Sequence, residues 1–148
     1  MSRIDEHLEQ WQHNRKFLQD ISPEFPDWIV TASLYVAIHA AEALLTADGA
    51  KARSRHQDRL EILQSEPRYQ RIYQSFHVLY NLAHVTRYSA KPGRWMPSQD
   101  IEQKVIRDAI YPIEASVKRL LLAAKPSITM PTVSKIALKP AIDDKNLA

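Results

Sequence analysis

The chain has 148 residues, of which 45% are hydrophobic and 25% are charged, as expected for one globular domain with a sizeable core. The net charge of +3 is compatible with a nucleic-acid partner but does not indicate a dense basic surface. With only two glycines and no cysteine, the composition argues against β-sandwiches, phosphate-cradling glycine loops, disulfides and thiolate metal sites, and we expect a cytoplasmic protein.

The first predicted helix spans residues 4–20. One face of it carries, at helical spacing, the residues Ile4, Leu8, Trp11, Arg15 and Leu18. The opposite face is mostly polar, which is typical of an amphipathic helix that packs on a core through one side. The segment Ser22–Asp27 contains two prolines, which end this helix and begin the next.

The second predicted helix, residues 27–48, is apolar on most of its faces, which indicates a buried central helix. Polar residues interrupt it too often for us to expect a membrane-crossing segment. Gly49 is expected to end it. Its polar residues form one stripe at spacings of three and four: Thr31, Tyr35, His39, Glu42 and Thr46. Because a buried polar group without a partner costs about 1–3 kcal/mol, this stripe must find partners elsewhere in the fold.

A short third helix is expected to end near Ser65, with Ser54 and Gln57 as its capping box. The fourth predicted helix, about residues 68–88, has an apolar stripe that includes Ile72 and Phe76. A second stripe on this helix consists of rings and one guanidinium: Tyr69, Tyr73, His77, Tyr80, His84 and Arg87.

A fifth helix is predicted from Ser98, with acids in its first turn and a kink at Pro112. From Pro126 no helical period holds, so the end of the chain is predicted to be an extended tail, either flexible or lying on a partner. The sequence therefore predicts an all-α fold. Residues 1–124 form an up-and-down bundle of four to five antiparallel helices, and residues 125–148 form the extended C-terminal tail.

The two polar stripes are the sharpest candidate for a site, because we expect them to face each other with part of the third helix beside them. The residues of this polar seam or ligand site are Tyr35, His39, Glu42, His56, Arg59, Tyr73, Tyr80, His84 and Arg87. In a purely structural interpretation, Glu42 accepts a hydrogen bond from Arg59 or a histidine. A metal site at His39, His77 and His84 is an alternative, but the glutamates of di-iron bundles are missing, so we predict no metal and no cofactor.

Arg71 and His77 are separated by five residues and are candidate catalytic residues for metal-free RNA cleavage. His77 would act as general acid or base, and Arg71 would stabilise phosphate charge. On an uninterrupted helix they lie about 120° apart, so they cooperate only if the helix begins late or a second subunit contributes. The loop residues Lys91, Arg94 and Trp95 combine positive charge with a ring, as in contacts to single-stranded nucleic acid; the alternative is a solvated basic loop.

The sequence from Tyr35 to Glu42, with His39 between them, resembles the second-helix signature of HEPN-type helical domains. In that signature an aromatic residue, a histidine and a glutamate recur in this order. Three further pieces are similar to the rest of the pattern: Asp27-Trp28, His56-Gln-Asp-Arg59 and Arg87-Tyr88. The resemblance covers about residues 4–122.

The resemblance implies a helical bundle that is commonly a homodimer. Many HEPN-type domains are ribonucleases in toxin–antitoxin, phage-defence or CRISPR-associated systems, and others bind nucleotides, RNA or proteins without catalysis. Active members carry Arg-x(4–6)-His late in the domain, usually with a polar residue directly after the arginine, whereas here Ile72 follows Arg71 and the last helix has no histidine.

We therefore expect a HEPN-like RNA- or nucleotide-associated protein in a defence or toxin–antitoxin setting, which is a metal-independent endoribonuclease if it is an enzyme. One alternative is a non-catalytic interaction module that binds a protein partner through the C-terminal tail. A metal-dependent helical-bundle enzyme is the other.

Overall fold

The computed structural model describes residues 2–50, 55–88, 98–132 and 134–140. All regular secondary structure in these ranges is helical, which confirms the predicted all-α class. The elements in chain order are α1 (Arg3–Asp20), α2 (Pro26–Ala47), α3 (His56–Ser65), the 3₁₀ turn η1 (Pro67–Tyr69), α4 (Gln70–Tyr88), α5 (Ser98–Asp100), the π-helical segment η2 (Ile101–Ile110) and α6 (Tyr111–Ala124). The predicted capping serine of the third helix, Ser54, lies outside the described residues.

Helix α1 begins with a capping box that the sequence analysis did not identify. The Ser2 hydroxyl accepts from the backbone N–H of Asp5 at 3.2 Å, and the Asp5 carboxylate accepts from the backbone N–H of Ser2 at 3.1 Å. These two bonds satisfy backbone donors that a helix leaves free at its first turn. They fix the point at which α1 starts to run alongside α2.

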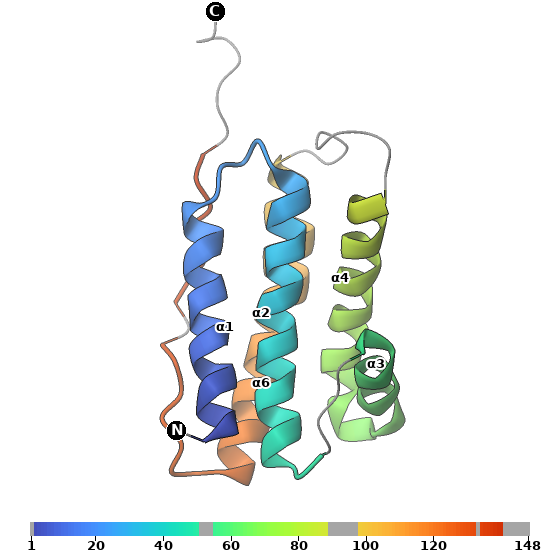
Figure 1. Ribbon diagram of the computed structural model, residues 1–148, viewed down its shortest axis with the longest axis vertical. Helices are drawn as coiled ribbons and strands as arrows, with labels where there is room; N and C mark the ends of the chain where they lie inside the picture. The colour runs from blue at the N-terminus through green and yellow to red at the C-terminus, as the bar shows by residue number, and fades with distance from the viewer. Residues whose placement is uncertain (1, 51–54, 89–97, 133, 141–148) are drawn as a thin grey trace, which may run out of the picture.

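Helix α2 lies at the centre of the fold, as its all-round apolar sequence predicts. It packs against α1, α4, η2 and α6, and Figure 1 shows it between α1 and α4 with α6 behind. By length and composition α2 would also span a membrane, but 78% of its apolar window is buried inside the protein, which is the behaviour of a core helix. Its end has the geometry expected of a glycine cap: Gly49 has φ +80°, and the N–H of Ala50 donates to the carbonyl of Leu45 at 2.9 Å.

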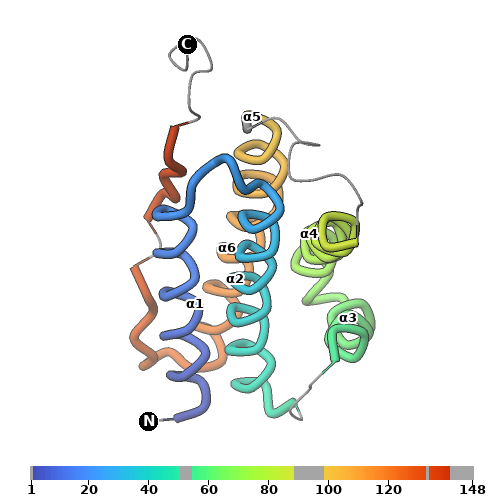
Figure 2. Tube along the Cα trace, turned by 45° about the horizontal axis from the view of Figure 1, so that its top comes forward, coloured from blue at the N-terminus to red at the C-terminus, as the bar shows by residue number. Residues whose placement is uncertain are grey.

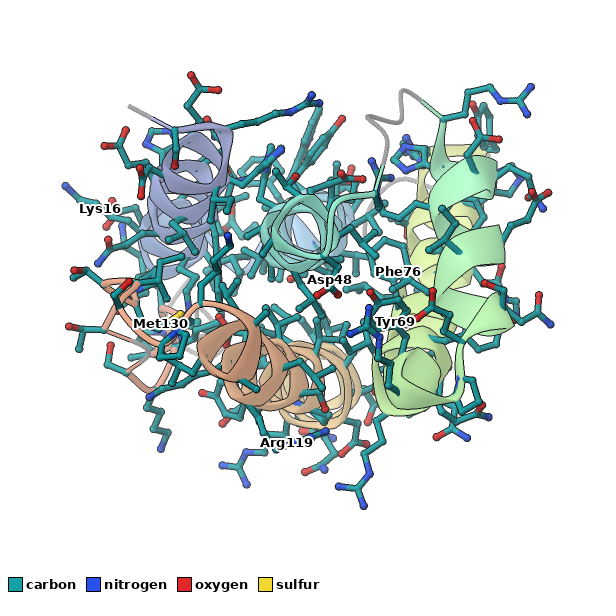
Figure 3. All side chains as sticks on the ribbon, turned by 90° about the horizontal axis from the view of Figure 1, so that it is seen from below. Lys16, Asp48, Tyr69, Phe76, Arg119 and Met130 are labelled. Atoms are coloured by element: carbon teal, nitrogen blue, oxygen red, sulfur yellow. The ribbon has the colours of Figure 1, made fainter. Side chains whose placement is uncertain are left out.

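Helix α3 crosses the long axis of the molecule, since Figure 1 shows it end-on and Figure 3, viewed along that axis, shows it from the side. The η1 turn then returns the chain into α4. The buried Tyr69 of this turn donates its hydroxyl proton to the carboxylate of Asp48 at the end of α2, and Figure 3 shows these two residues between α2 and α4. This contact joins the lower ends of α2 and α4.

The kink predicted at Pro112 takes the form of a change in helical register. Residues Ile101–Ile110 are π-helical, and the N–H of Tyr111 donates to Ile106, five residues earlier. Proline has no N–H to give to the carbonyl of Asp108, and that carbonyl instead accepts from the Ser75 hydroxyl of α4 at 3.4 Å. The register change therefore places η2 against α4 and lets α6 continue as an ordinary α-helix.

Beyond α6 the chain makes a turn at Pro126 and Ser127, which is closed by a hydrogen bond from the N–H of Ile128 to the carbonyl of Lys125 at 3.1 Å. The described residues that follow, 128–132 and 134–140, have no helix and run beside α1, as the orange-to-red trace of Figures 1 and 2 shows. We call residues 125–140 the C-terminal segment. It lies on its own chain, and its Ile136 is 2% exposed and belongs to the hydrophobic core. This segment therefore extends the core beyond residue 124, the last residue of the predicted bundle.

Candidate functional site

A buried ion pair forms the centre of the polar seam. Arg59 of α3 donates from Nε to the carboxylate of Glu42 of α2 at 2.7 Å, and the two side chains are 5% and 4% exposed. Arg59 also contacts Nδ1 of His56 through Nη1 at 3.2 Å, and the His56 ring lies 5.6 Å from that of Tyr80 on α4. Since Arg59 can only donate, His56 accepts at Nδ1 and is neutral in this arrangement. Four of the nine predicted seam residues are thus joined.

His39 finds its partner on α1 and not on α4. Its Nδ1 lies 3.1 Å from Nδ1 of His7, and the ring centroids are 5.4 Å apart, so the two nitrogens point at each other. One of them donates and the other accepts, which means that the pair holds a single proton between the rings. The sequence analysis missed His7, although its position four residues before the buried Trp11 places it at the edge of the packed face of α1.

The surroundings of these histidines oppose their protonation. Burial lowers the pKa of His39 to about 4, and the neighbouring His7 and the Arg59 guanidinium act in the same direction. Burial also lowers the pKa of His7, although Glu42 and Glu6 oppose this shift, and burial together with Arg59 and Arg87 lowers that of His56. The cluster is therefore built to be uncharged at its imidazoles.

We expect the protein to lose stability as the pH falls from 6.5 towards 4. In this window the unfolded chain binds protons at histidines that the folded chain keeps neutral, so unfolding takes up protons and acid favours it. Thermal melts between pH 7.5 and 4.5 measure the effect. The His39→Gln protein should show a smaller change in melting temperature across this range, whereas a change at the exposed His13 should not alter it. An identical pH profile for the His39→Gln and wild-type proteins would contradict the assignment.

The seam residues His84 and Arg87 lie on the outer side of α4, as does His77 of the same stripe, whereas Tyr73 is half-buried and packs against the core. His77 and His84 are exposed; the Tyr73 ring stacks on His77 at 5.6 Å, and the His84 ring lies 4.7 Å from Tyr88, which is 74% exposed. Arg87 is also exposed and donates to the carbonyl of Ala83 in its own helix. The expectation that the two stripes face each other along their length is therefore wrong for this half of the seam, because the apolar stripe of α4 is the side that packs on α2.

Arg71 and His77 are both exposed and belong to one continuous helix, because α4 is helical from Gln70 onwards. The late helix start that would bring them together does not occur. Six residues apart, they differ by about 120° around the axis and about 9 Å along it. Within one chain, His77 contacts Asn81 at 3.2 Å and stacks on Tyr73.

Two further groups of predicted residues have different outcomes. Tyr35 is 45% exposed and shares one face of α2 with Trp28, seven residues earlier and 56% exposed. These two rings lie at the surface and not in the seam. The predicted nucleic-acid contacts Lys91, Arg94 and Trp95 lie outside the described residues.

A second buried ion pair, which the sequence analysis did not identify, joins α1 to α6. The carboxylate of Glu114 accepts from Nε of Arg15 at 2.7 Å and from the indole N–H of Trp11 at 2.6 Å, and Arg15 also donates to the carbonyl of Ser134. Burial raises the pKa of Glu114, while the bonds from Arg15 and Trp11 oppose that shift. The sequence indicates this pair only by one charged residue on each of two apolar helix faces. Arg15 lies between Trp11 and Leu18, and Glu114 lies beside Ile113 and Val117.

Among the described residues, no group of three His, Asp or Glu side chains is arranged to hold a metal ion. No protein-family model matches the chain, and no curated protein or solved structure matches it either. The resemblance to HEPN-type domains therefore stays a prediction that rests on the residues quoted for it.

Proposed function

We propose that the protein is a HEPN-like domain, built as an up-and-down bundle of antiparallel helices, that binds single-stranded RNA through the exposed side of α4. The observation that carries this proposal is the composition of that helix. Over its 19 residues α4 has no acidic side chain, and it exposes Arg71, His77, His84, Arg87 and Tyr88. Cations attract the phosphate backbone, and exposed rings stack on unpaired bases.

Cleavage by this surface would require a homodimer. An RNA phosphate near His77 cannot also meet Arg71 of the same helix at close range, because the two side chains point in different directions. A second copy could supply the missing arginine, with His77 as general base towards the ribose 2′-hydroxyl and Arg71 stabilising the phosphate. The proposed setting in phage defence or a toxin–antitoxin pair, and a cytoplasmic location, rest on the resemblance alone.

The test is binding and cleavage of a mixed single-stranded RNA pool by the purified protein in excess EDTA. We expect Tyr88→Ala to weaken binding about fivefold or more, since stacking on one base contributes about 1–3 kcal/mol. His77→Ala should abolish any cleavage. The matched control is Arg119→Ala, which removes one exposed charge from the outer side of α6, where Figure 3 labels it, and should leave binding unchanged. Equal losses for Tyr88→Ala and Arg119→Ala would reject α4 as the contact surface.

The second candidate is a non-catalytic interaction module. Four large apolar side chains of α1 and α2 and their connection are about half exposed: Phe17 (46%), Phe25 (50%), Trp28 (56%) and Tyr35 (45%). Exposed apolar side chains of this size are found where proteins bind one another. Absence of RNA binding in low salt would favour this candidate over the first.

A further inference from the structure

The C-terminal segment follows α1 over most of the length of that helix. Clefts at its inner edge are lined by residues 129–132 and 134 together with α1 residues between Asp5 and Gln19. Its end at residues 138–140 lines a further cleft with Pro23 and Ile29. The segment contains no helix, and its backbone is extended. The end of the chain is thus a non-helical segment that lies along the surface of the helices.

Around Ile136, side chains alternate between the core and the solvent. Ile136 is buried and Leu138 packs against the core, whereas Lys135, Ala137 and Lys139 are exposed. Ile128 and Met130 also pack against the core, but the alternation does not continue through Thr132 and Ser134, which are exposed. A spacing of two is the period of an extended strand, in which alternate side chains point to the same side. Met130 is labelled in Figure 3, where the segment passes beside α1 and α6. The residues around Ile136 therefore have the alternation expected of an extended chain that lies with one side in a groove.

Two side chains of the bundle bind the main chain of the segment. Arg15 of α1 donates to the carbonyl of Ser134, and the Tyr111 hydroxyl of α6 accepts from the N–H of Ile136 at 2.9 Å. Arg15 is 3% exposed and is held in place by Glu114. Both contacts are made to backbone groups. Arg15 and Tyr111 would therefore bind any extended chain that places an aliphatic residue where Ile136 lies.

The middle of the segment is only partly packed against α1. Clefts of about 410 and 420 Å³ lie where residues 129–132 and 134 meet α1, and they are lined by polar side chains such as Gln12, His13 and Lys16. Among the described residues of the segment, only Ile136 is fully buried. A peptide held by one fully buried side chain, three half-buried ones and two main-chain hydrogen bonds has a low local stability compared with the helices beside it.

We propose that the groove between α1 and α6 is a binding site for an extended peptide segment of a partner protein, and that the C-terminal segment occupies it as an internal, displaceable ligand. The partner segment carries aliphatic side chains at alternate positions, one of them in the place of Ile136. Arg15 and Tyr111 bind its backbone. When it binds, the C-terminal segment leaves the groove.

The experiment uses a fluorescent peptide of residues 126–140 and full-length proteins. In the Ile136→Asp protein the charged side chain expels the segment, so we expect the peptide to bind this protein at least about tenfold more tightly than wild type. Ala137→Asp is the matched control, because this exposed neighbour points away from the groove, and it should bind the peptide like wild type. A peptide that itself carries Ile136→Asp should not bind. Equal peptide binding by all three proteins, with unchanged circular dichroism, would overturn the proposal.

If the Ile136→Asp protein loses its helical circular dichroism, it is unfolded and cannot test the proposal. Hydrogen exchange of the wild-type protein then tests whether the segment leaves the groove. We expect the amide of Ile136 to exchange at least about tenfold faster than the buried amides of α1, because the segment leaves while the bundle stays folded. Exchange of Ile136 only with global unfolding would show that the segment is a fixed part of the core and would reject displacement. A concentration-dependent dimer that excess peptide dissociates would assign the groove to the same segment of a second copy and reject a separate partner.

Discussion

Replacing Glu42 with alanine should destabilise the protein by about 3–5 kcal/mol, the usual cost of removing one partner of a buried ion pair. Glu42 is 4% exposed and accepts from Arg59, which is 5% exposed. Without the carboxylate, the guanidinium is left buried among α2, α3 and α4, and among the described residues its remaining side-chain partner is the neutral His56. Urea unfolding followed by circular dichroism measures the loss in the free energy of unfolding.

The control for this prediction is Glu61→Ala on the same α3 helix. Glu61 is exposed and accepts a long hydrogen bond of 3.4 Å from Gln57, so its removal should change stability by less than about 0.5 kcal/mol. The double mutant Glu42→Ala/Arg59→Ala should lose less than the sum of the two single changes, because it buries no unpaired charge. Additive losses would show that the pair is not coupled in the way its geometry indicates.

The helices of this protein were predictable from the sequence because their signals are local. The apolar period of α2, the glycine that ends it and the proline that alters α6 each act within one or two turns, and the structure has an element boundary or a change of register at each. The capping box at Ser2 and Asp5 was just as local and was missed because it lies at the first residues of the chain.

The partners of the polar residues were harder to predict, because they depend on how helices pack. Glu42 and Arg59 are 17 residues apart, and the short connection between α2 and α3 keeps them close. His39 could equally have met α4, and only the side-by-side packing of α1 and α2 gives it His7. The pair of Arg15 and Glu114 spans 99 residues and has no signal beyond a charge on each apolar face.

The position of the C-terminal segment on the helices was difficult to predict for a different reason. Without a helical period, its prolines and scattered aliphatics indicated only an extended chain. The alternation from Lys135 to Lys139 can be interpreted only when the groove beneath it is known. An isolated strand-like segment has no paired strand in the sequence to reveal its place, so the surface that receives it has to come from the structure.

Replacing Glu114 with alanine should also cost about 3–5 kcal/mol, since it leaves Arg15 buried without its carboxylate and the Trp11 indole N–H without an acceptor. This substitution differs from Glu42→Ala in one consequence. Arg15 also donates to the carbonyl of Ser134, so a guanidinium that is no longer held by Glu114 loosens the C-terminal segment.

Hydrogen exchange at Ile136, compared between the Glu114→Ala and Glu42→Ala proteins, separates the two ion pairs. Both variants should be destabilised to a similar extent, because both leave a buried arginine unpaired. Only Glu114→Ala should accelerate exchange of the Ile136 amide beyond the change that global stability alone produces. Equal acceleration in both variants would mean that Glu114 stabilises the fold without orienting Arg15 towards the segment. A selective effect would identify the Glu114–Arg15 pair as the element that couples the core to the occupied groove.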